Sequence, residues 1–295
     1  MDISQEQNKA DVLIEALPYF QDFYGSTVLV KFGGSAMEDM ERAHNVLRDV
    51  AFMSVAGLKP IVVHGGGKAI NGELAKAGVQ PRFINGLRYT DGETIRVVDR
   101  VLHQVVNREL VRFLQEELHV DACPVSGKNI MRCQKIGTTD PATGEELDLG
   151  FVGKVVNVDT PQIQWILGRR QLPVVTPLAS DQNGGVFNIN ADMAACEIAA
   201  ELKVRKLVFL SDVPGVLRDP KDPSSLISSI HCNEVEEMIA SGIISGGMIP
   251  KMQCCVDAIE GGVERVHILD GRIPHSILIE LLSDEGIGTM LKRED

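Results

Sequence analysis

The sequence contains no apolar run long enough to span a bilayer, and it is poor in aromatic residues, with Trp165 as its one tryptophan among 295 residues. Its N-terminal segment is acidic and polar, which argues against a signal or transit peptide, so we expect a cytoplasmic protein with no membrane partner. Basic residues are also scarce, because 29 Lys and Arg face 41 Asp and Glu. The resulting charge of -12 disfavours nonspecific nucleic-acid binding.

Cysteine pairs in metal-binding spacing are missing. None of the six cysteines lies in a C-x-x-C arrangement, and Cys254 and Cys255 are adjacent. Reduced thiols are expected in such a chain, and we expect no protein-held metal.

The two common phosphate-binding loops are absent as well. The stretch IVVHGGGKAI at 61–70 lacks the first glycine and the final Ser or Thr of a P-loop, since Val62 and Ala69 stand there. A dinucleotide fingerprint fails at Ile70, which disfavours a dehydrogenase. Three glycines between a strand and a helix still predict a loop that binds an anion.

Apolar runs and helical stretches alternate along the chain, which predicts an α/β protein with a mainly parallel sheet. Strands are expected at 27–32, 61–63, 121–126, 172–178, 206–213, 265–270 and 289–291, and helices at 38–56, 68–77, 91–118, 191–202, 233–241, 250–260 and from 274. The polar, turn-rich segment 128–154 is expected to project as a hairpin or flap.

An additional helix is expected ahead of the first strand. Leu13, Leu17, Phe20 and Tyr24 form one stripe at helical spacing over 6–24, and Pro18 should kink it. We therefore divide the chain into an N-terminal helix at 1–26, an N-terminal lobe at 27–180 and a C-terminal lobe at 181–295.

Two lysines occupy unusual positions. Lys31 ends an apolar strand that opens into Gly33 and Gly34, at the strand end where α/β sheets bind ligands. Lys251 falls in the first turn of a helix, where a cation opposes the helix dipole, so a functional role is favoured over a solvated surface position.

Polar side chains gather in two further segments. Asn190 and Asp192 suit a helix cap, but capping does not explain Asn188 on the preceding strand. Arg88 could grip a carboxylate through two parallel hydrogen bonds, although a surface arginine is the commoner case. His64 ends a buried strand, where a structural role is favoured.

Two glycine turns and two lysines suit a polyphosphate and a moving phosphoryl group. We recognise no Ser-His-Asp or Cys-His arrangement that would supply a nucleophile with its general base. A kinase needs no base if its acceptor is a carboxylate, which is already ionised at neutral pH. Lysines, backbone N–H groups and Mg²⁺ bound with ATP would then relieve the repulsion between two anions.

Taken together, these segments resemble the amino acid kinase family. The resemblance rests on K-F-G-G-S at 31–35, V-H-G-G-G at 63–67, N-G-L-R at 85–88, N-x-N-A-D at 188–192, L-S-D-V-x-G at 210–215 and G-G-M-x-x-K at 246–251. The set most closely resembles the members that act on N-acetyl-L-glutamate. It implies an open α/β/α sandwich and transfer of the γ-phosphoryl group of ATP to the side-chain carboxylate of that substrate, in arginine biosynthesis.

The resemblance also implies roles for individual positions. Lys31 and Lys251 would stabilise the transition state, and Asp192 would orient them. The acetylated amino acid would contact Gly66, Gly67, Arg88 and Asn188, and the nucleotide would contact Gly33, Gly34, Asp212, Leu217 and Ser245. No fixed role follows for Lys68.

Regulation by L-arginine is implied in the same way. In arginine-inhibited members of the family, a similar N-terminal helix interlaces dimers into a hexamer, so a homo-hexamer is expected here. Glu280, with His267 and Gly286 nearby in the pattern, would bind the inhibitor. Two alternatives stay open: a sister kinase acting on aspartate or glutamate, and a catalytically silent sensor of amino acid or nucleotide.

Overall fold

The computed structural model describes residues 3–37, 39–140, 143–283 and 286–294. Its centre is an eight-stranded sheet in the order β12-β14-β13-β11-β1-β2-β8-β5. The strands are β1 (Thr27–Phe32), β2 (Lys59–His64), β5 (Ala122–Val125), β8 (Leu172–Val175), β11 (Lys206–Ser211), β12 (Ser229–His231), β13 (Arg265–Asp270) and β14 (Thr289–Lys292). Every neighbouring pair is parallel except β13 and β14, which confirms the predicted mainly parallel sheet.

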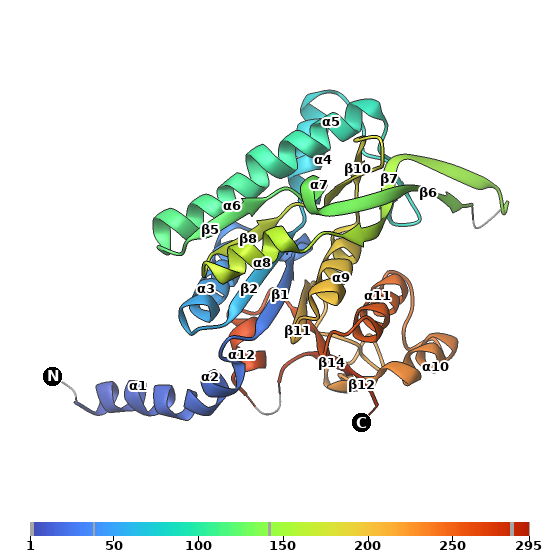
Figure 1. Ribbon diagram of the computed structural model, residues 1–295. Helices are drawn as coiled ribbons and strands as arrows, with labels where there is room; N and C mark the ends of the chain where they lie inside the picture. Colours follow the sequence, from blue (N-terminus) through green and yellow to red (C-terminus); the bar gives the residue numbers. More distant parts are fainter. Residues whose placement is uncertain (1–2, 38, 141–142, 284–285, 295) are drawn as a thin grey trace.

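Helices cover both faces of this sheet (Figure 1). The α-helices are α1 (Ile3–Glu15), α2 (Leu17–Phe23), α3 (Met40–Val55), α4 (Gly67–Lys76), α5 (Gly92–Arg100), α6 (Arg108–Arg112), α7 (Gly127–Ile130), α8 (Pro161–Gly168), α9 (Ala191–Leu202), α10 (Val235–Ala240), α11 (Met248–Glu260) and α12 (Ser276–Leu281). Short 3-10 turns lie at Gly34–Met37, Pro223–Ser225 and Cys232–Glu234. None of the described helices is long and apolar enough to cross a membrane.

Alternate residues of β1 enter two different hydrophobic cores. Val28, Val30 and Phe32 pack in the core that includes α3 and α5, whereas Leu29 packs in the core that includes α9 and α11. Side chains alternate between the two faces of a strand, so Lys31 lies on the same face as Leu29. The sandwich implied by the family resemblance is confirmed, and it turns Lys31 toward α9 and α11.

The helix expected over 91–118 is continuous but not uniform. It runs from Gly92 to Glu117, with π-helical segments at Val101–Asn107 and Phe113–Glu117 on either side of α6. Wider π turns of this kind often mark functional positions in helices.

A second, smaller sheet stands apart from the main one. The expected hairpin is confirmed as β6 (Met131–Thr139) and β7 (Glu146–Val158), and it closes into a small barrel with β9 (Leu178–Ser180) and β10 (Val186–Asn188). In Figure 1 the hairpin projects from the body of the molecule. The single strand expected at 172–178 is wrong, because the chain leaves the main sheet after Val175 and Pro177 offers no backbone N–H to a ladder.

The N-terminal segment is bent as predicted. Helix α1 (Ile3–Glu15) and helix α2 (Leu17–Phe23) meet at Ala16, two residues before Pro18. Helix α1 extends away from the body (Figure 1), whereas α2 ends on the core with the buried Phe23. Only the first part of the apolar stripe is left without a partner on its own chain: Leu13 and Leu17 are 60% and 46% exposed, whereas the ring of Phe20 lies 5.7 Å from that of Phe52. The division into a helix and two lobes stays a prediction.

Candidate active site

The candidate site lies at the carboxyl ends of β1, β2 and β11. Strand β1 is central, with β2 on one side and β11 on the other. The strands beyond β2 come from the first part of the chain and those beyond β11 from the last part. Ligands of open α/β sheets bind in the crevice where the strand order reverses in this way.

Lys31, Asp192 and Lys251 meet in this crevice from three elements, β1, α9 and α11. The Nζ atom of Lys31 lies 2.7 Å from Oδ1 of Asp192, as an ion pair. Lys251 donates a hydrogen bond to Oδ2 of the same carboxylate. The three side chains are 12–20% exposed, so the cluster is largely but not fully buried.

The helix cap and the lysine contacts use different residues. The side chain of Asn190 caps α9 by accepting from the backbone N–H groups of Asp192 and Met193. Asp192 is thereby left to face the two lysines. Burial alone would raise the pKa of the Asp192 carboxyl, but the two ammonium groups lower it to about 2. This carboxylate therefore stays ionised and is too weak a base to take a proton.

Lys251 occupies the helix position that the sequence marked as electrostatically poor. It lies in the first turn of α11, and its ammonium also sits 4.9 Å from the ring centre of Phe209. The Asp192 carboxylate and the aromatic face offset the unfavourable helix dipole.

The two glycine loops pack against each other beside this cluster. A Cβ atom added at Gly33 would lie 3.2 Å from Nζ of Lys31 and 3.4 Å from Cα of Gly65. Gly34 adopts a φ of +60°, which favours glycine. A Cβ atom at Gly66 would lie 2.6 Å from Cδ2 of Leu102. The loops therefore need glycine both to reach the site and to fit beneath the long helix.

A short hairpin brings Arg88 to the second loop. Strands β3 (Phe83–Ile84) and β4 (Leu87–Arg88) are joined by Asn85 and Gly86, both at positive φ, as a tight hairpin requires. Arg88 is buried, stacks on the ring of Phe83 at 4.7 Å and donates weakly to the carbonyl of Gly67 at 3.4 Å.

The guanidinium of Arg88 is not fully satisfied. Its Nη1 has no hydrogen-bond partner among the described residues. Burial lowers the pKa of this guanidinium, which still remains charged at neutral pH. A buried cation with an unused donor suits a carboxylate ligand.

Asn188 is connected to Arg88 through a residue that the sequence did not single out. Thr90 donates from Oγ1 to the carbonyl of Arg88 at 2.8 Å, and its Oγ1 accepts weakly from Asn188 Nδ2 at 3.4 Å. Thr90 also bridges to Gly150, where any side chain would collide with the Thr90 carbonyl. In the sequence, the position of Thr90 two residues after the N-G-L-R segment was the one indication of this link.

The residues expected to contact the nucleotide lie next to two elements, β11 and α11. Asp212 and Leu217 lie in the loop after β11, and Ser245 lies exposed just before α11. Their contact with a nucleotide stays a prediction.

His64 has the structural role that was favoured. It is fully buried, and burial lowers its pKa to about 4, so the ring is neutral. Its Nδ1 donates to the carbonyl of Gly65 at 2.7 Å, and its Nε2 accepts from the amide of Asn107 at 3.0 Å. The ring thus fixes the start of the second glycine loop.

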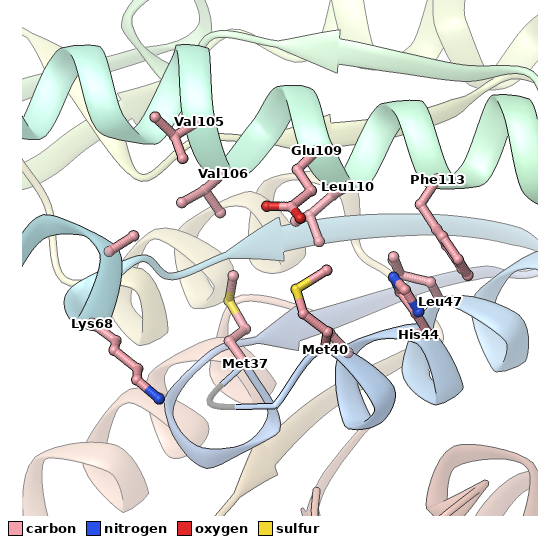
Figure 2. A pocket seen from close by; sticks show the side chains of 12 residues that line it. Met37, Met40, His44, Leu47, Lys68, Val105, Val106, Glu109, Leu110 and Phe113 are labelled. Carbon is pink, nitrogen blue, oxygen red and sulfur yellow. The ribbon is translucent and has the colours of Figure 1, made fainter. Parts of the chain in front are cut away.

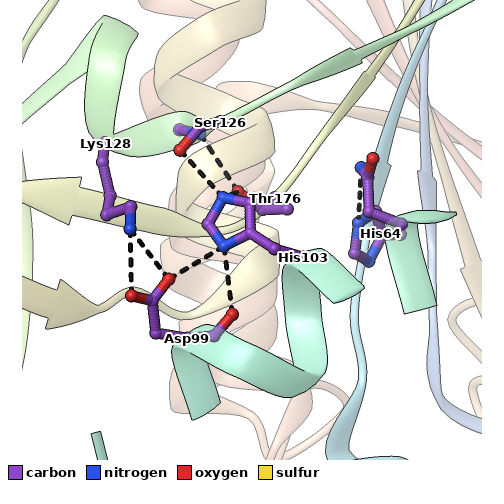
Figure 3. A network of polar contacts seen from close by, with 8 residues as sticks. His64, Asp99, His103, Ser126, Lys128 and Thr176 are labelled. Carbon is purple, nitrogen blue, oxygen red and sulfur yellow. Dashed lines mark hydrogen bonds and ion pairs between the residues drawn. The ribbon is translucent and has the colours of Figure 1, made fainter. Parts of the chain in front are cut away.

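A polar network missed by sequence reasoning lies next to His64 (Figure 3). His103 pairs with Asp99 at 2.8 Å through Nδ1, and Asp99 also accepts from Lys128 at 2.9 Å. Nε2 of His103 accepts from Ser126 at 2.8 Å. The network ties the long helix to the loop after β5, and the spacing of Asp99 and His103 by one helical turn was its one sequence signal.

An apolar pocket of about 280 Å³ lies between α3 and the long helix, separate from the lysine cluster (Figure 2). Met40, Leu47 and Phe113 line it, and Lys68 stands at its rim. Lys68 therefore contributes to the lining of this pocket, and its role stays open.

The three residues expected to bind arginine also come together. His267 donates from Nδ1 to Oε1 of Glu280 at 2.6 Å, and Oε2 accepts from the backbone of Ile287 and Gly288. Burial would raise the pKa of Glu280, but these donors hold it below its ordinary value. Gly286 adopts a φ of +63°, and a Cβ there would lie 2.8 Å from Oε2.

The described residues offer no cluster of three or more His, Cys, Asp or Glu side chains that could hold a metal ion. The site thus combines two ammonium groups on one carboxylate, two glycine loops and a buried arginine. This arrangement can hold two anions close together and stabilise a phosphoryl group between them.

Comparison with known proteins agrees with this geometry. The model of the amino acid kinase family matches residues 26–270. Acetylglutamate kinase from Syntrophomonas wolfei is 46% identical over 99% of this chain and 100% of its own length. Acetylglutamate kinase from Brachyspira hyodysenteriae is 45% identical over 100% of both chains.

A solved structure supports the fold. The N-acetylglutamate synthase of Neisseria gonorrhoeae, complexed with coenzyme A and N-acetyl-glutamate, superposes with a TM-score of 0.83 at 26% identity. The match covers 97% of this chain and 64% of that one. By its sequence, its sheet and its site, the chain belongs to the amino acid kinase family.

Proposed function

We propose that this chain transfers the γ-phosphoryl group of ATP to the side-chain carboxylate of N-acetyl-L-glutamate, a step of arginine biosynthesis. The observation that carries the proposal is the cluster of Lys31 and Lys251 on one carboxylate beside the incompletely paired Arg88. The near full-length similarity to acetylglutamate kinases selects this substrate among the carboxylates that the family phosphorylates.

The reaction joins an acceptor oxygen to the γ-phosphorus and breaks the bond to the bridging oxygen, releasing ADP. The acceptor carboxylate has a pKa of about 4 and is already an anion at neutral pH, so no base is required. The barrier includes repulsion between this anion and the polyphosphate, which the two ammonium groups reduce. The Asp192 carboxylate holds both ammonium groups in place, and its low pKa keeps it ionised throughout the reaction.

The amino acid would lie over the second glycine loop. We place its α-carboxylate on Arg88 and Asn188, and its reacting carboxylate near the N–H groups of Gly66 and Gly67. This placement is supported by the weak contact between Arg88 and the carbonyl of Gly67 and by the buried Nη1 of Arg88, which has no hydrogen-bond partner among the described residues.

The nucleotide would approach from the other side of β1. Gly33 and Gly34 would cradle its phosphates, and Asp212, Leu217 and Ser245 would flank the rest. Mg²⁺ would arrive with ATP, held by phosphate oxygens and water, since the ion retains several waters in most phosphoryl-transfer sites. It would neutralise the phosphates while the lysines act on the transferred group.

The test is acceptor specificity measured by trapping the acyl phosphate with hydroxylamine in the presence of ATP and Mg²⁺. N-acetyl-L-glutamate should give hydroxamate at least 100-fold faster than L-glutamate or L-aspartate. A preference for either free amino acid would assign a sister kinase. Tight binding of ATP and acetylglutamate without hydroxamate would assign a sensor.

We further propose that the protein works in the cytoplasm as a homo-hexamer inhibited by L-arginine. The exposed apolar side chains of α1, together with Leu17, support the assembly, because such a surface is favourably covered by another copy. The buried carboxylate of Glu280 supports an arginine site, since a guanidinium requires an anion.

A further inference from the structure

His64 and Asn107 form a buried hydrogen-bond chain behind the second glycine loop. Asn107 is 2% exposed and ends the π-helical segment Val101–Asn107. Its Nδ2 atom donates to the carbonyl of Val174 on β8 at 2.8 Å and lies 3.0 Å from Nε2 of His64. The chain therefore joins the long helix, the main sheet and the first residue before the three glycines.

These contacts fix which ring nitrogen of His64 carries the proton. A backbone carbonyl only accepts hydrogen bonds, so the atom of Asn107 that faces Val174 must be the amide nitrogen and not the amide oxygen. The second hydrogen of that nitrogen is then directed to Nε2 of His64, which must accept it. A neutral imidazole has one N–H group, which therefore lies at Nδ1 and donates to the carbonyl of Gly65 at 2.7 Å.

The ring in turn controls the direction of a backbone N–H group in the loop. The carbonyl of Gly65 and the N–H of Gly66 belong to one planar trans peptide, so they point in opposite directions. The hydrogen bond to the carbonyl therefore directs the N–H of Gly66 away from His64. The same π-helical segment also confines the loop at Gly66, where an added Cβ would lie 2.6 Å from Cδ2 of Leu102.

We propose that Asn107 is a positioning residue for phosphoryl transfer: by holding His64 in the tautomer with its proton on Nδ1, it aims the N–H of Gly66 at the reacting carboxylate. The proposal rests on the proposed function, which places that carboxylate near the N–H groups of Gly66 and Gly67. With the proton on Nε2 instead, the lone pair of Nδ1 would face the Gly65 carbonyl oxygen, and the peptide would have to turn. A misplacement of about 1 Å at a reacting group can cost about 100-fold in rate.

The surroundings of the ring keep it neutral, so the choice of tautomer matters. Burial and, to a smaller extent, the charge of His103 lower the pKa of His64 to about 4, against the raising effect of its own hydrogen bond. His103 lies on the long helix and is paired with Asp99, which also binds Lys128 (Figure 3). These three groups are unchanged in the variants below, so comparison with wild type removes their contribution to a pH profile.

The first test is Asn107→Asp, compared with wild type by kcat at saturating substrates between about pH 5.5 and 8.5. The new carboxylate competes for the protons of His64. At low pH the pair holds enough protons for Nδ1 to keep one, but at high pH the one remaining ring proton is drawn to Nε2. The ratio of variant to wild-type kcat should therefore fall at least about tenfold as the pH rises. Asn157→Asp makes the same change at an exposed position of β7 and should give a constant ratio. A ratio for Asn107→Asp that does not change with pH would refute its role.

A pair of substitutions at His64 tests the tautomer with Asn107 in place. The amide nitrogen of asparagine lies as many bonds from Cβ as Nδ1 does, and that of glutamine as many as Nε2. His64→Asn can therefore still donate to Gly65, whereas the amide of His64→Gln is directed to Asn107. We expect kcat to fall at least about tenfold further in His64→Gln than in His64→Asn, with the KM for ATP within about threefold of wild type in both. Equal losses or the reverse order would contradict the proposal, and this pair decides the question if Asn107→Asp does not fold.

The tautomer can also be measured without any activity. Magic-angle-spinning NMR of the ¹⁵N-labelled wild-type protein should show His64 protonated at Nδ1 and unprotonated at Nε2, with its signals assigned by their loss in His64→Asn. A proton on Nε2 would overturn the proposal whatever the kinetics. The expected tautomer in a wild-type protein that forms no hydroxamate would instead refute the proposed function, so the two failures are distinguishable.

Discussion

The carboxylate of Asp192 gives the sharpest test of how the site is held together. Asp192→Asn keeps the size of the side chain and removes the charge that lies between Lys31 and Lys251. Two partly buried ammonium groups would then face each other without an anion between them. We expect a less stable protein and a much slower enzyme.

The structure sets the size of the stability loss. A carboxyl whose pKa falls from about 4 to about 2 prefers its ionised form by roughly 2.5 kcal/mol more when folded than when unfolded. The neutral amide forfeits this preference, so the free energy of unfolding should fall by about 2–3 kcal/mol at neutral pH.

The difference should also depend on pH, with a defined sign. Because the folded pKa is depressed, the ionised carboxylate stabilises the fold at any pH above about 4. This contribution is lost as the pH falls through about 2. Urea unfolding at pH 7, 4 and 3 should therefore show the gap between wild type and Asp192→Asn shrinking.

Activity should fall further than stability alone predicts. Without the carboxylate the two lysines are no longer held in one geometry, and we expect kcat to drop by about 100-fold at saturating substrates. Glu201→Gln is a matched control, because it removes the same charge from an exposed position near the end of the same helix. A folded Asp192→Asn protein with the kcat of wild type would refute the orienting role.

Four further predictions follow from other parts of the molecule. Lys251→Ala should lower kcat by about 100- to 1000-fold while changing ATP affinity little, as measured by steady-state kinetics and calorimetry, because the charge acts most in the transition state; equal losses in both would contradict this. Arg88→Lys should weaken acetylglutamate binding about tenfold and spare ATP, since lysine lacks the planar fork, and a matching loss for ATP would move Arg88 out of the amino-acid site. Deletion of residues 1–24 should give active dimers by light scattering and raise the arginine concentration needed for inhibition, whereas a full-length dimer would exclude the proposed hexamer. Glu280→Gln should blunt arginine inhibition in a protein that remains hexameric, and unaltered inhibition would place the effector elsewhere.

Much of the main sheet was predictable, because its strands are short apolar runs followed by glycine or polar turns. The helix expected at 191–202 matches α9 (Ala191–Leu202), since an Asn cap begins it and a left-handed Lys203 ends it. Such local signals are strong where propensity and burial agree.

The small barrel was not predictable from local pattern. Strand β10 pairs with β9 and β7, and β9 also pairs with β6, far away in the sequence. The local pattern of the segment 172–178 indicates one apolar strand, although the strand is interrupted at Thr176 and Pro177. Pro177 offers no backbone N–H and so ends the first strand, but the sheet in which the chain continues depends on partners far away in the sequence.

The site was predictable as a set of residues and not as a set of contacts. Lys31 was singled out because it ends a strand that opens into two glycines, and Lys251 because it falls in the first turn of a helix. That one carboxylate joins them depends on the side-by-side packing of α9 and α11, which no local pattern encodes. Thr90 and the His103 network escaped notice because each lies in an ordinary helical or turn context.

The position of β1 has a consequence for how the protein is made. Its β2 neighbour follows within about 30 residues, but its β11 neighbour is synthesised about 180 residues later. At roughly 5–20 residues per second, one edge of β1 remains without its partner for about 10–35 seconds while the chain leaves the ribosome. An apolar edge that waits so long can pair with the wrong strand. The strand that carries Lys31 is therefore also a place where a nascent chain is exposed to aggregation, and where a chaperone would protect it.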